Sequence, residues 1–293
     1  STMGIEVVKA NGSTVVYNLT KSVFSSSPIY KSRVIVADSK KIGYLSYARF
    51  SNKENSEAAL TNVINDFASS GVTDLIIDFR YNGGGYVETA EHLINLLAPS
   101  GTTGTMFTEY FNATMQAGNA KILTNQPLLD AAGKIRYSNG RMLTYADVNY
   151  APSANVTNFE KKGNLSNIGK IVFLVSKSTA SASELVINSL KPFVDVSLVG
   201  ATTYWKPIGF FPITIENKYD VYFSLFETKN SKGEGGYYDG MPPTVAASEL
   251  VAGTSNYIMY DFGDVRDGLI KQAISLIAPN AAIVNSSTSA KSS

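Results

Sequence analysis

The chain contains no cysteine and only one histidine, His92, among its 293 residues. The first absence excludes disulfides and thiolate metal sites, and the second excludes metal sites built from several histidines. The chain also lacks an excess of charge of either sign, since it has 25 Lys and Arg and 24 Asp and Glu. This balance gives no reason to expect nucleic acid or an anionic membrane as a partner. No apolar run reaches the roughly 20 residues of a transmembrane segment. The sequence predicts no cofactor and no metal, and it leaves the oligomeric state open.

What is present is enough apolar material for a full core, since 44% of the residues are hydrophobic. Residues 1–32 predict a small β segment with a turn at Asn11-Gly12, followed by a polar connector. Residues 33–284 are interpreted as the main domain. Within it, residues 100–168 are rich in Gly, Asn, Thr and Ser, and we interpret them as an insertion with short elements. The tail 285–293 has the composition of a disordered segment.

The main domain alternates short apolar runs with segments of helical periodicity, which predicts an α/β fold. Helices are expected over residues 54–70, 87–97, 183–190 and 264–277. Strands are expected over 33–37, 42–50, 75–77, 171–175, 196–199, around 210–215 and around 221–226, with a glycine-rich loop over 229–244.

The first candidate for chemistry is a serine in the turn between a predicted strand and a predicted helix. Ser181 lies in the run Thr179-Ala180-Ser181-Ala182-Ser183-Glu184. A serine there is presented at the end of a strand, and the N–H groups that open the helix can stabilise an oxyanion. The same residues also match a capping box formed by Ser181 and Glu184, which is a structural motif without a catalytic role.

The second candidate is Lys206, which follows one predicted helix and one predicted strand and can therefore lie beside Ser181. A lysine amine takes a proton from serine only when it is neutral, and apolar surroundings favour the neutral form. The alternative is a lysine lying along an aromatic surface with its amine in water. The neighbours of Lys206 favour an apolar pocket: they are Tyr204, Trp205, Ile208, Phe210 and Phe211.

A glycine run, Asn82-Gly83-Gly84-Gly85, follows the strand expected at 75–77. Glycines let the backbone approach a ligand and expose its N–H groups, although an ordinary strand-to-helix turn has the same composition. A nucleotide site is disfavoured because no Gly-Lys-Ser/Thr follows. His92 is interpreted as an ordinary residue of a helix face, because no carboxylate lies at the spacing of a catalytic triad.

Together these segments resemble the carboxyl-terminal processing (tail-specific) serine protease family. The strand pattern Asp-x-Arg-x-Asn-x-Gly-Gly is matched by Asp78 to Gly85, and the serine pattern by Thr179 to Glu184. The stretch Val-Gly-x-x-Thr-x-x-Lys is matched without a gap by Val199 to Lys206. The similarity covers roughly residues 33–280.

The resemblance implies an α/β fold of the ClpP/crotonase-like ββα superhelix type, with a small N-terminal β segment. It implies that Ser181 is the nucleophile and Lys206 its general base. It further implies that the oxyanion hole is formed by the N–H of Gly84 or Gly85 and that of Ala182. In many members a Gln and an Asp occupy two further positions that here are Phe210 and Pro192, so only a Ser–Lys dyad is implied.

The resemblance also implies a protein or peptide substrate and an exported enzyme of the bacterial cell envelope or periplasm. Residues 1–32 are similar to the last strands of a PDZ-like module. The alternative function is a non-catalytic protein on the same fold that binds a peptide or an apolar ligand, and a serine-reactive probe separates the two.

Overall fold

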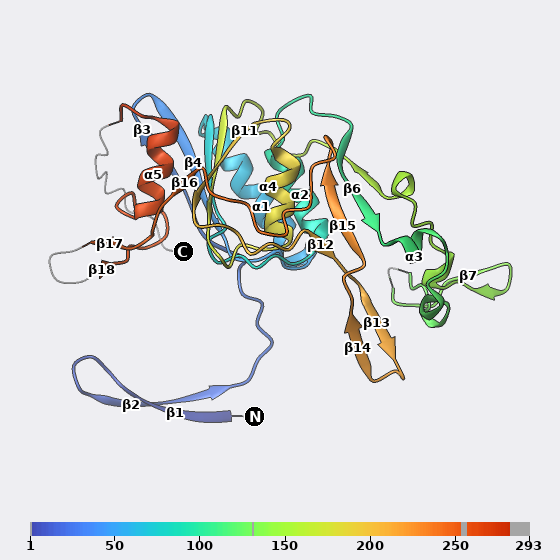
Figure 1. Ribbon diagram of the computed structural model, residues 1–293. Coiled ribbons are helices and arrows are strands. Elements are labelled where there is room, and N and C mark those ends of the chain that lie inside the picture. Colours follow the sequence, from blue (N-terminus) through green and yellow to red (C-terminus); the bar gives the residue numbers. More distant parts are fainter. Residues whose placement is uncertain (1, 131, 253–256, 282–293) are drawn as a thin grey trace.

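A six-stranded mixed sheet lies at the centre of the protein (Figure 1), a computed structural model that describes residues 2–130, 132–252 and 257–281. The strand order is β16-β11-β10-β5-β4-β3. β3 and β4 pair antiparallel, and each of the other neighbouring pairs is parallel. The strands are β3 (Ile29–Ala37), β4 (Lys40–Tyr47), β5 (Asp74–Asp78), β10 (Lys170–Val175), β11 (Asp195–Gly200) and β16 (Val245–Ala246).

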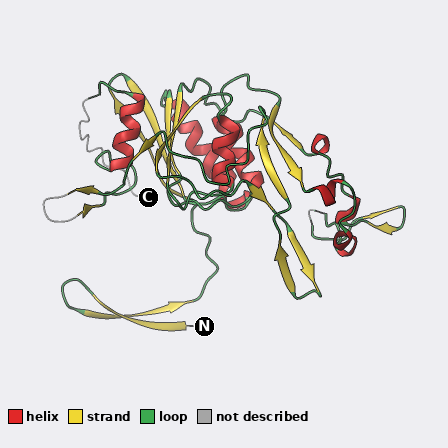
Figure 2. Cartoon of the chain, in the orientation of Figure 1, coloured by secondary structure: helices red, strands yellow, loops and turns green. Residues whose placement is uncertain are grey.

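Helices cover both faces of this sheet (Figure 2), as a mixed α/β fold requires. One face packs against α1 (Lys53–Ser69), α2 (Val87–Leu97) and α4 (Ala182–Leu190), and the other packs against α5 (Gly268–Ile277). Leu75 and Ile77 of β5 point to the three helices, whereas Ile76 points to α5. β5 is therefore buried on both faces, which explains why its sequence is a continuous apolar run.

The element boundaries agree closely with the sequence analysis where a local signal exists. α2 spans the expected residues, and α1 is followed by Gly71, whose φ of +71° is the conformation that ends a helix. α5 begins at Gly268, later than the expected 264, because the side chain of Asp267 accepts hydrogen bonds from the N–H groups of Leu269 and Ile270.

A second, antiparallel sheet lies beside the first and has the strand order β12-β15-β6-β9. Its strands are β12 (Ile208–Gly209), β15 (Phe226–Asn230), β6 (Thr105–Phe111) and β9 (Val156–Asn158). The insertion 100–168 supplies β6 and β9, together with α3 (Ala113–Gln116), β7 (Tyr137–Ser138), β8 (Arg141–Met142) and the 3₁₀ turns η1 (Lys121–Asn125), η2 (Tyr145–Asp147) and η3 (Pro152–Ala154).

Two strand predictions shift in this region. The runs expected around 210–215 and 221–226 form the hairpin of β13 (Pro212–Ile215) and β14 (Tyr219–Tyr222). β15 extends to Asn230, into the loop expected from residue 229, because it pairs along β6. That partner is distant in sequence, so no local pattern could indicate the pairing.

At the N-terminus, β1 (Thr2–Val8) and β2 (Thr14–Thr20) form the expected antiparallel hairpin around Asn11-Gly12. β3 starts at Ile29, so the connector is shorter than expected. Near the other end, β17 (Val251–Ala252) pairs with β18 (Tyr257–Ile258). The tail expected at 285–293 lies outside the described residues. Among the helices described, none combines the length and hydropathy needed to span a membrane.

Candidate active site

Three adjacent parallel strands bring the candidate residues to one edge of the central sheet. β10 lies between β5 and β11, and all three run in the same direction. The glycine loop follows β5, the Ser181 turn follows β10, and the Lys206 loop follows β11. The carboxyl ends of parallel strands share one edge, which is where open α/β sheets place their ligands. The expected proximity of the Lys206 and Ser181 turns is therefore confirmed at the level of the strands.

Ser181 occupies an unusual backbone conformation directly before α4. Its φ is +57°, a region that residues with a Cβ rarely adopt. The Glu184 carboxylate accepts a hydrogen bond of 2.9 Å from the Ser181 N–H. Ala182 is the first residue of α4, and its N–H has no acceptor among the described residues. A free N–H thus lies immediately after the candidate nucleophile.

The glycine loop is fastened to the serine turn by Asn82, which is fully buried. The carbonyl of Asn82 accepts from the Ala180 N–H and from the Ser183 hydroxyl, at 3.1 and 3.0 Å. Its side-chain amide donates to the carbonyl of Tyr47 at 2.9 Å. Sequence reasoning included Asn82 in a motif but missed this role, which depends on two loops that are far apart in the chain.

Gly84 and Gly85 fill different roles in this loop. The Gly84 N–H donates to Asn82 Oδ1 at 2.9 Å, which removes Gly84 from the candidate oxyanion donors. A Cβ on Gly84 would lie 2.8 Å from Ser181 Cβ, so Gly84 instead allows the two loops to touch. The Gly85 N–H has no acceptor among the described residues. Gly85 and Ala182 are therefore the two donors that remain available.

Glu184 joins the serine turn to the lysine loop. Besides the Ser181 N–H, its carboxylate accepts hydrogen bonds from the N–H groups of Trp205 and Lys206, each at 2.9 Å, and from the Thr203 hydroxyl at 2.6 Å. The side chain is fully buried. The capping-box signal located Glu184 correctly, but it could not reveal that the same carboxylate holds the backbone of the lysine loop.

The Lys206 side chain is partly buried, and its amine lies 4.4 Å from the centroid of the Phe210 ring. Within the part of the chain that the structure describes, no hydrogen bond joins this amine to the Ser181 hydroxyl. Both residues nevertheless line one small pocket of about 80 Å³, together with Gly85 and Ala182. The structure therefore gathers the expected residues in one pocket, with the Lys206 amine turned to an aromatic ring.

The aromatic surroundings expected for Lys206 are only partly present. Tyr204 and Trp205 stack on each other and are 49% and 54% exposed, so they do not enclose the amine. Phe211 stacks on Tyr145 of the insertion instead. Of these aromatic residues, Phe210 is the one whose ring face contacts the Lys206 amine. Phe210 and Phe211 lie in the short link between β12 and the strand Pro212–Ile215, and their rings contact different parts of the chain.

His92 lies apart from this pocket, on α2 where it packs against α1. One ring nitrogen is 2.8 Å from the Thr61 hydroxyl, and the other is 3.7 Å from a carboxylate oxygen of Glu57. Burial lowers the pKa of His92, with Glu57 acting in the opposite direction. His92 therefore contributes to helix packing. A metal-binding group of His, Asp and Glu is not found among the described residues.

The chain belongs to peptidase family S41, because the model of this family matches residues 41–247, more than half of the chain. A protein of Bacteroides fragilis assigned to the S41 proteases has a similar structure, with 21% identity and a TM-score of 0.64 over 94% of this chain and 65% of its own. The photosystem II D1 C-terminal processing protease is 19% identical, with a TM-score of 0.53 over 84% of this chain and 55% of its own. These two likenesses concern the fold, and the chain spans less than two thirds of either relative. No curated protein matches the sequence.

Proposed function

We propose that this chain is the catalytic part of a serine endopeptidase of the carboxyl-terminal processing type. Ser181 is the nucleophile, Lys206 is its general base, and the N–H groups of Gly85 and Ala182 form the oxyanion hole. The observation that carries the proposal is that these four residues line the same pocket. Membership of peptidase family S41 supports it independently.

In the proposed mechanism, the neutral Lys206 amine swings from the Phe210 ring to Ser181 and takes the hydroxyl proton. Side chains change rotamer within nanoseconds, and catalytic hydrogen bonds often tighten only when substrate is bound. The Ser181 oxygen then attacks the peptide carbonyl, and the Gly85 and Ala182 N–H groups hold the oxyanion. The protonated Lys206 gives its proton to the leaving amine. Water hydrolyses the resulting acyl-enzyme and regenerates the serine.

The substrate in this proposal is a protein or peptide, and its C-terminal part is the segment that is recognised. Residues 1–32 supply the last strands of a PDZ-like module, and residues 33–284 form the catalytic domain. The enzyme is exported and acts in the cell envelope or periplasm. The resemblance of the sequence to tail-specific proteases is what supports these statements.

Substitution of the dyad tests the proposal directly. Ser181→Ala and Lys206→Ala are each expected to abolish cleavage of casein while far-UV circular dichroism and the melting temperature remain close to wild type. His92→Ala is the control, and we expect it to retain cleavage because His92 lies outside the pocket. Full activity in either dyad variant would contradict the mechanism.

One observation favours a second candidate, a non-catalytic binding protein on the same fold. The Lys206 amine contacts Phe210 rather than Ser181, as it would in a protein that had lost catalysis. The two candidates differ in one property: a peptidase reacts covalently with serine-directed probes at Ser181, and a binding protein does not.

A further inference from the structure

A large pocket adjoins the candidate active site. Its volume is about 800 Å³, against about 80 Å³ for the pocket that contains Ser181. Lys206, Pro207, Ile208 and Phe226 line both, so the two pockets adjoin each other. The larger volume lies within the range of roughly 300–1,000 Å³ that is typical of ligand sites. A space that can hold a bulky side chain therefore lies next to the pocket of Ser181.

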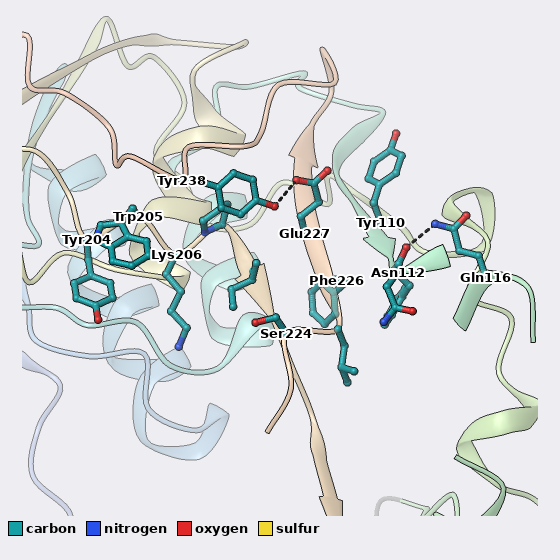
Figure 3. Close-up of a pocket in the computed structure, with 14 residues that line it drawn as sticks. Tyr110, Asn112, Gln116, Tyr204, Trp205, Lys206, Ser224, Phe226, Glu227 and Tyr238 are labelled. Carbon is teal, nitrogen blue, oxygen red and sulfur yellow. Dashed lines mark hydrogen bonds between the residues drawn. The ribbon is translucent and has the colours of Figure 1, made fainter. Parts of the chain in front are cut away.

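The walls of the large pocket come from segments that are far apart in the sequence (Figure 3). Tyr110 and Phe111 of β6 form one wall, and Trp205 and Tyr238 form the opposite side. Phe226 is almost completely buried, whereas Trp205 and Tyr238 are more than half exposed. The wall of β6 belongs to the insertion 100–168, so this insertion shapes the space beside the nucleophile.

Two polar side chains of the pocket, Glu227 and Gln116, already have partners within the protein. The Glu227 carboxylate accepts from the Tyr238 hydroxyl at 3.0 Å and pairs with Lys229 at 2.9 Å. The Gln116 amide donates to the carbonyl of Phe111 at 2.6 Å. An acidic occupant would consequently meet the carboxylate of Glu227, and the cation beside that carboxylate, Lys229, is already paired with it.

Among the described residues that line the large pocket, Lys206 is the one basic residue. Its amine is directed to the ring of Phe210, which lines the small pocket and not the large one. The amine thus contacts a ring of the small pocket, while the side chain of Lys206 lines both pockets. What the large pocket offers is a set of aromatic surfaces, which bind large uncharged side chains by apolar burial and ring packing.

We infer that the large pocket selects a large uncharged side chain, aromatic above all, that flanks the bond presented to Ser181. This inference rests on the proposed function, because it assigns the pocket to the substrate of that site. The selected class is a peptide segment with Phe, Tyr, Trp or Leu beside the scissile bond and without Asp or Glu at that position.

Binding can be measured without catalysis in the Ser181→Ala variant. Trp205 is the only tryptophan of the chain and lines the pocket, so its fluorescence reports occupancy. The probes are two blocked peptides, acetyl-Ala-Ala-Phe-Ala-Ala-amide and the same peptide with Glu in place of Phe. We expect saturable binding of the Phe peptide and at least tenfold weaker binding of the Glu peptide. Equal affinities, or no saturable change with the Phe peptide, would overturn the inference.

A charged substitution in the lining of the large pocket is the second test of the inference. Ser224 is exposed and lines the pocket. Ser224→Arg is expected to bring the affinities of the two peptides within threefold of each other, because the guanidinium supplies a counterion for Glu. Ser275→Arg, on the exposed surface of α5, is the matched control and should preserve the tenfold preference. An unchanged preference in Ser224→Arg would place the peptide elsewhere.

The same peptides separate this inference from the proposed function. If the Ser181→Ala variant binds the Phe peptide selectively and the wild-type chain cleaves neither peptide nor casein, the pocket assignment stands and the peptidase proposal fails. If the wild-type chain cleaves casein and products mapped by mass spectrometry show no aromatic enrichment within three residues of the cut, the pocket assignment fails and the peptidase proposal stands.

Discussion

At the scale of single residues, the contact between Gly84 and Ser181 sets the geometry of the candidate site. Gly84 has a φ of +100°, and a Cβ there would lie within 2.9 Å of both Ser181 Cβ and the Ala180 carbonyl oxygen. The neighbouring Gly83 has open space: its nearest atom, the Ser178 carbonyl oxygen, would be 4.0 Å away. A side chain can therefore be accommodated at Gly83 but not at the adjacent Gly84.

This difference gives a prediction with an internal control. Gly84→Ala should reduce casein cleavage at least 100-fold and lower the free energy of unfolding by about 1–3 kcal/mol, because the added methyl group clashes with the serine turn and φ is strained. Gly83→Ala should remain within threefold of wild-type activity. Activities would be compared at equal folded fractions, and similar behaviour of the two variants would contradict the role assigned to Gly84.

The family resemblance implied a group of Ser181, Lys206, Ala182 and either Gly84 or Gly85, and Ser181, Lys206, Ala182 and Gly85 line one pocket. The sequence did not allow the prediction of how Asn82 and Glu184 fasten the loops, or of which expected aromatic ring, that of Phe210, lies beneath the Lys206 amine. Such contacts depend on side-chain directions in loops, and no periodic signal encodes those directions.

At the scale of elements, β6 and α2 bring two carboxylates close together. Burial raises the pKa of Glu109 on β6 to about 7, and the charge of Glu91 on α2 adds to the effect. Between the ordinary carboxyl pKa and about 7, folded Glu109 binds a proton that the unfolded chain has released. The free energy of unfolding therefore falls as the pH rises through this range.

Glu109→Gln should remove this dependence. At pH 8 the variant is expected to melt a few degrees above wild type, because the cost of burying the charge is gone, whereas at pH 5 the two should melt within about 1 °C of each other. Glu54→Gln, at an exposed position of α1, is the control for loss of one charge. A stabilisation that is equal at both pH values would show that Glu109 does not titrate in this range.

The attachment of α5 to the central sheet is a second feature at this scale. Asp267 caps α5 and also accepts hydrogen bonds from the Arg80 guanidinium, at 2.7 and 3.3 Å. Arg80 in turn binds Asp78 at the end of β5, and both side chains are buried. The network thus joins α5 to the strand that carries the glycine loop.

Asp267→Ala should cost about 3 kcal/mol of unfolding free energy, because it removes a helix cap and leaves buried Arg80 with fewer acceptors. Urea denaturation measures the loss, and hydrogen exchange should show faster exchange of the α5 amides. Asp264→Ala, which breaks only the surface pair with Arg266, should cost less than about 1 kcal/mol. Equal losses in the two variants would argue against the buried network.

At the scale of the whole molecule, the central sheet could be expected from the sequence and the second sheet could not. Residues 75–77 and 171–175 are apolar runs between helical segments, so a parallel sheet with loops at one edge follows from local patterns. The pairing of β15 with β6 joins segments on opposite sides of Ser181 in the chain. Such a contact is long-range, and it is the one that builds the large pocket beside the nucleophile.

The large pocket and the small pocket together relate the fold to the proposed activity. Family S41 membership and the central sheet account for the loops that carry Ser181 and Lys206. The insertion then adds a wall that the central sheet alone does not provide. In this account the chemistry lies at the edge of the central sheet, and the insertion contributes one wall of the pocket that selects the substrate.

The central claim, that Lys206 activates Ser181, is tested most directly by the rate of covalent labelling with a fluorophosphonate probe. Intact-mass and peptide mass spectrometry would follow the wild-type chain, Ser181→Ala and Lys206→Ala. The account predicts one adduct per chain, located on Ser181, with labelling at least 100-fold slower in Lys206→Ala because general-base assistance is lost. Labelling of Ser181 at the same rate in both wild type and Lys206→Ala, or no labelling of the wild-type chain, would contradict it.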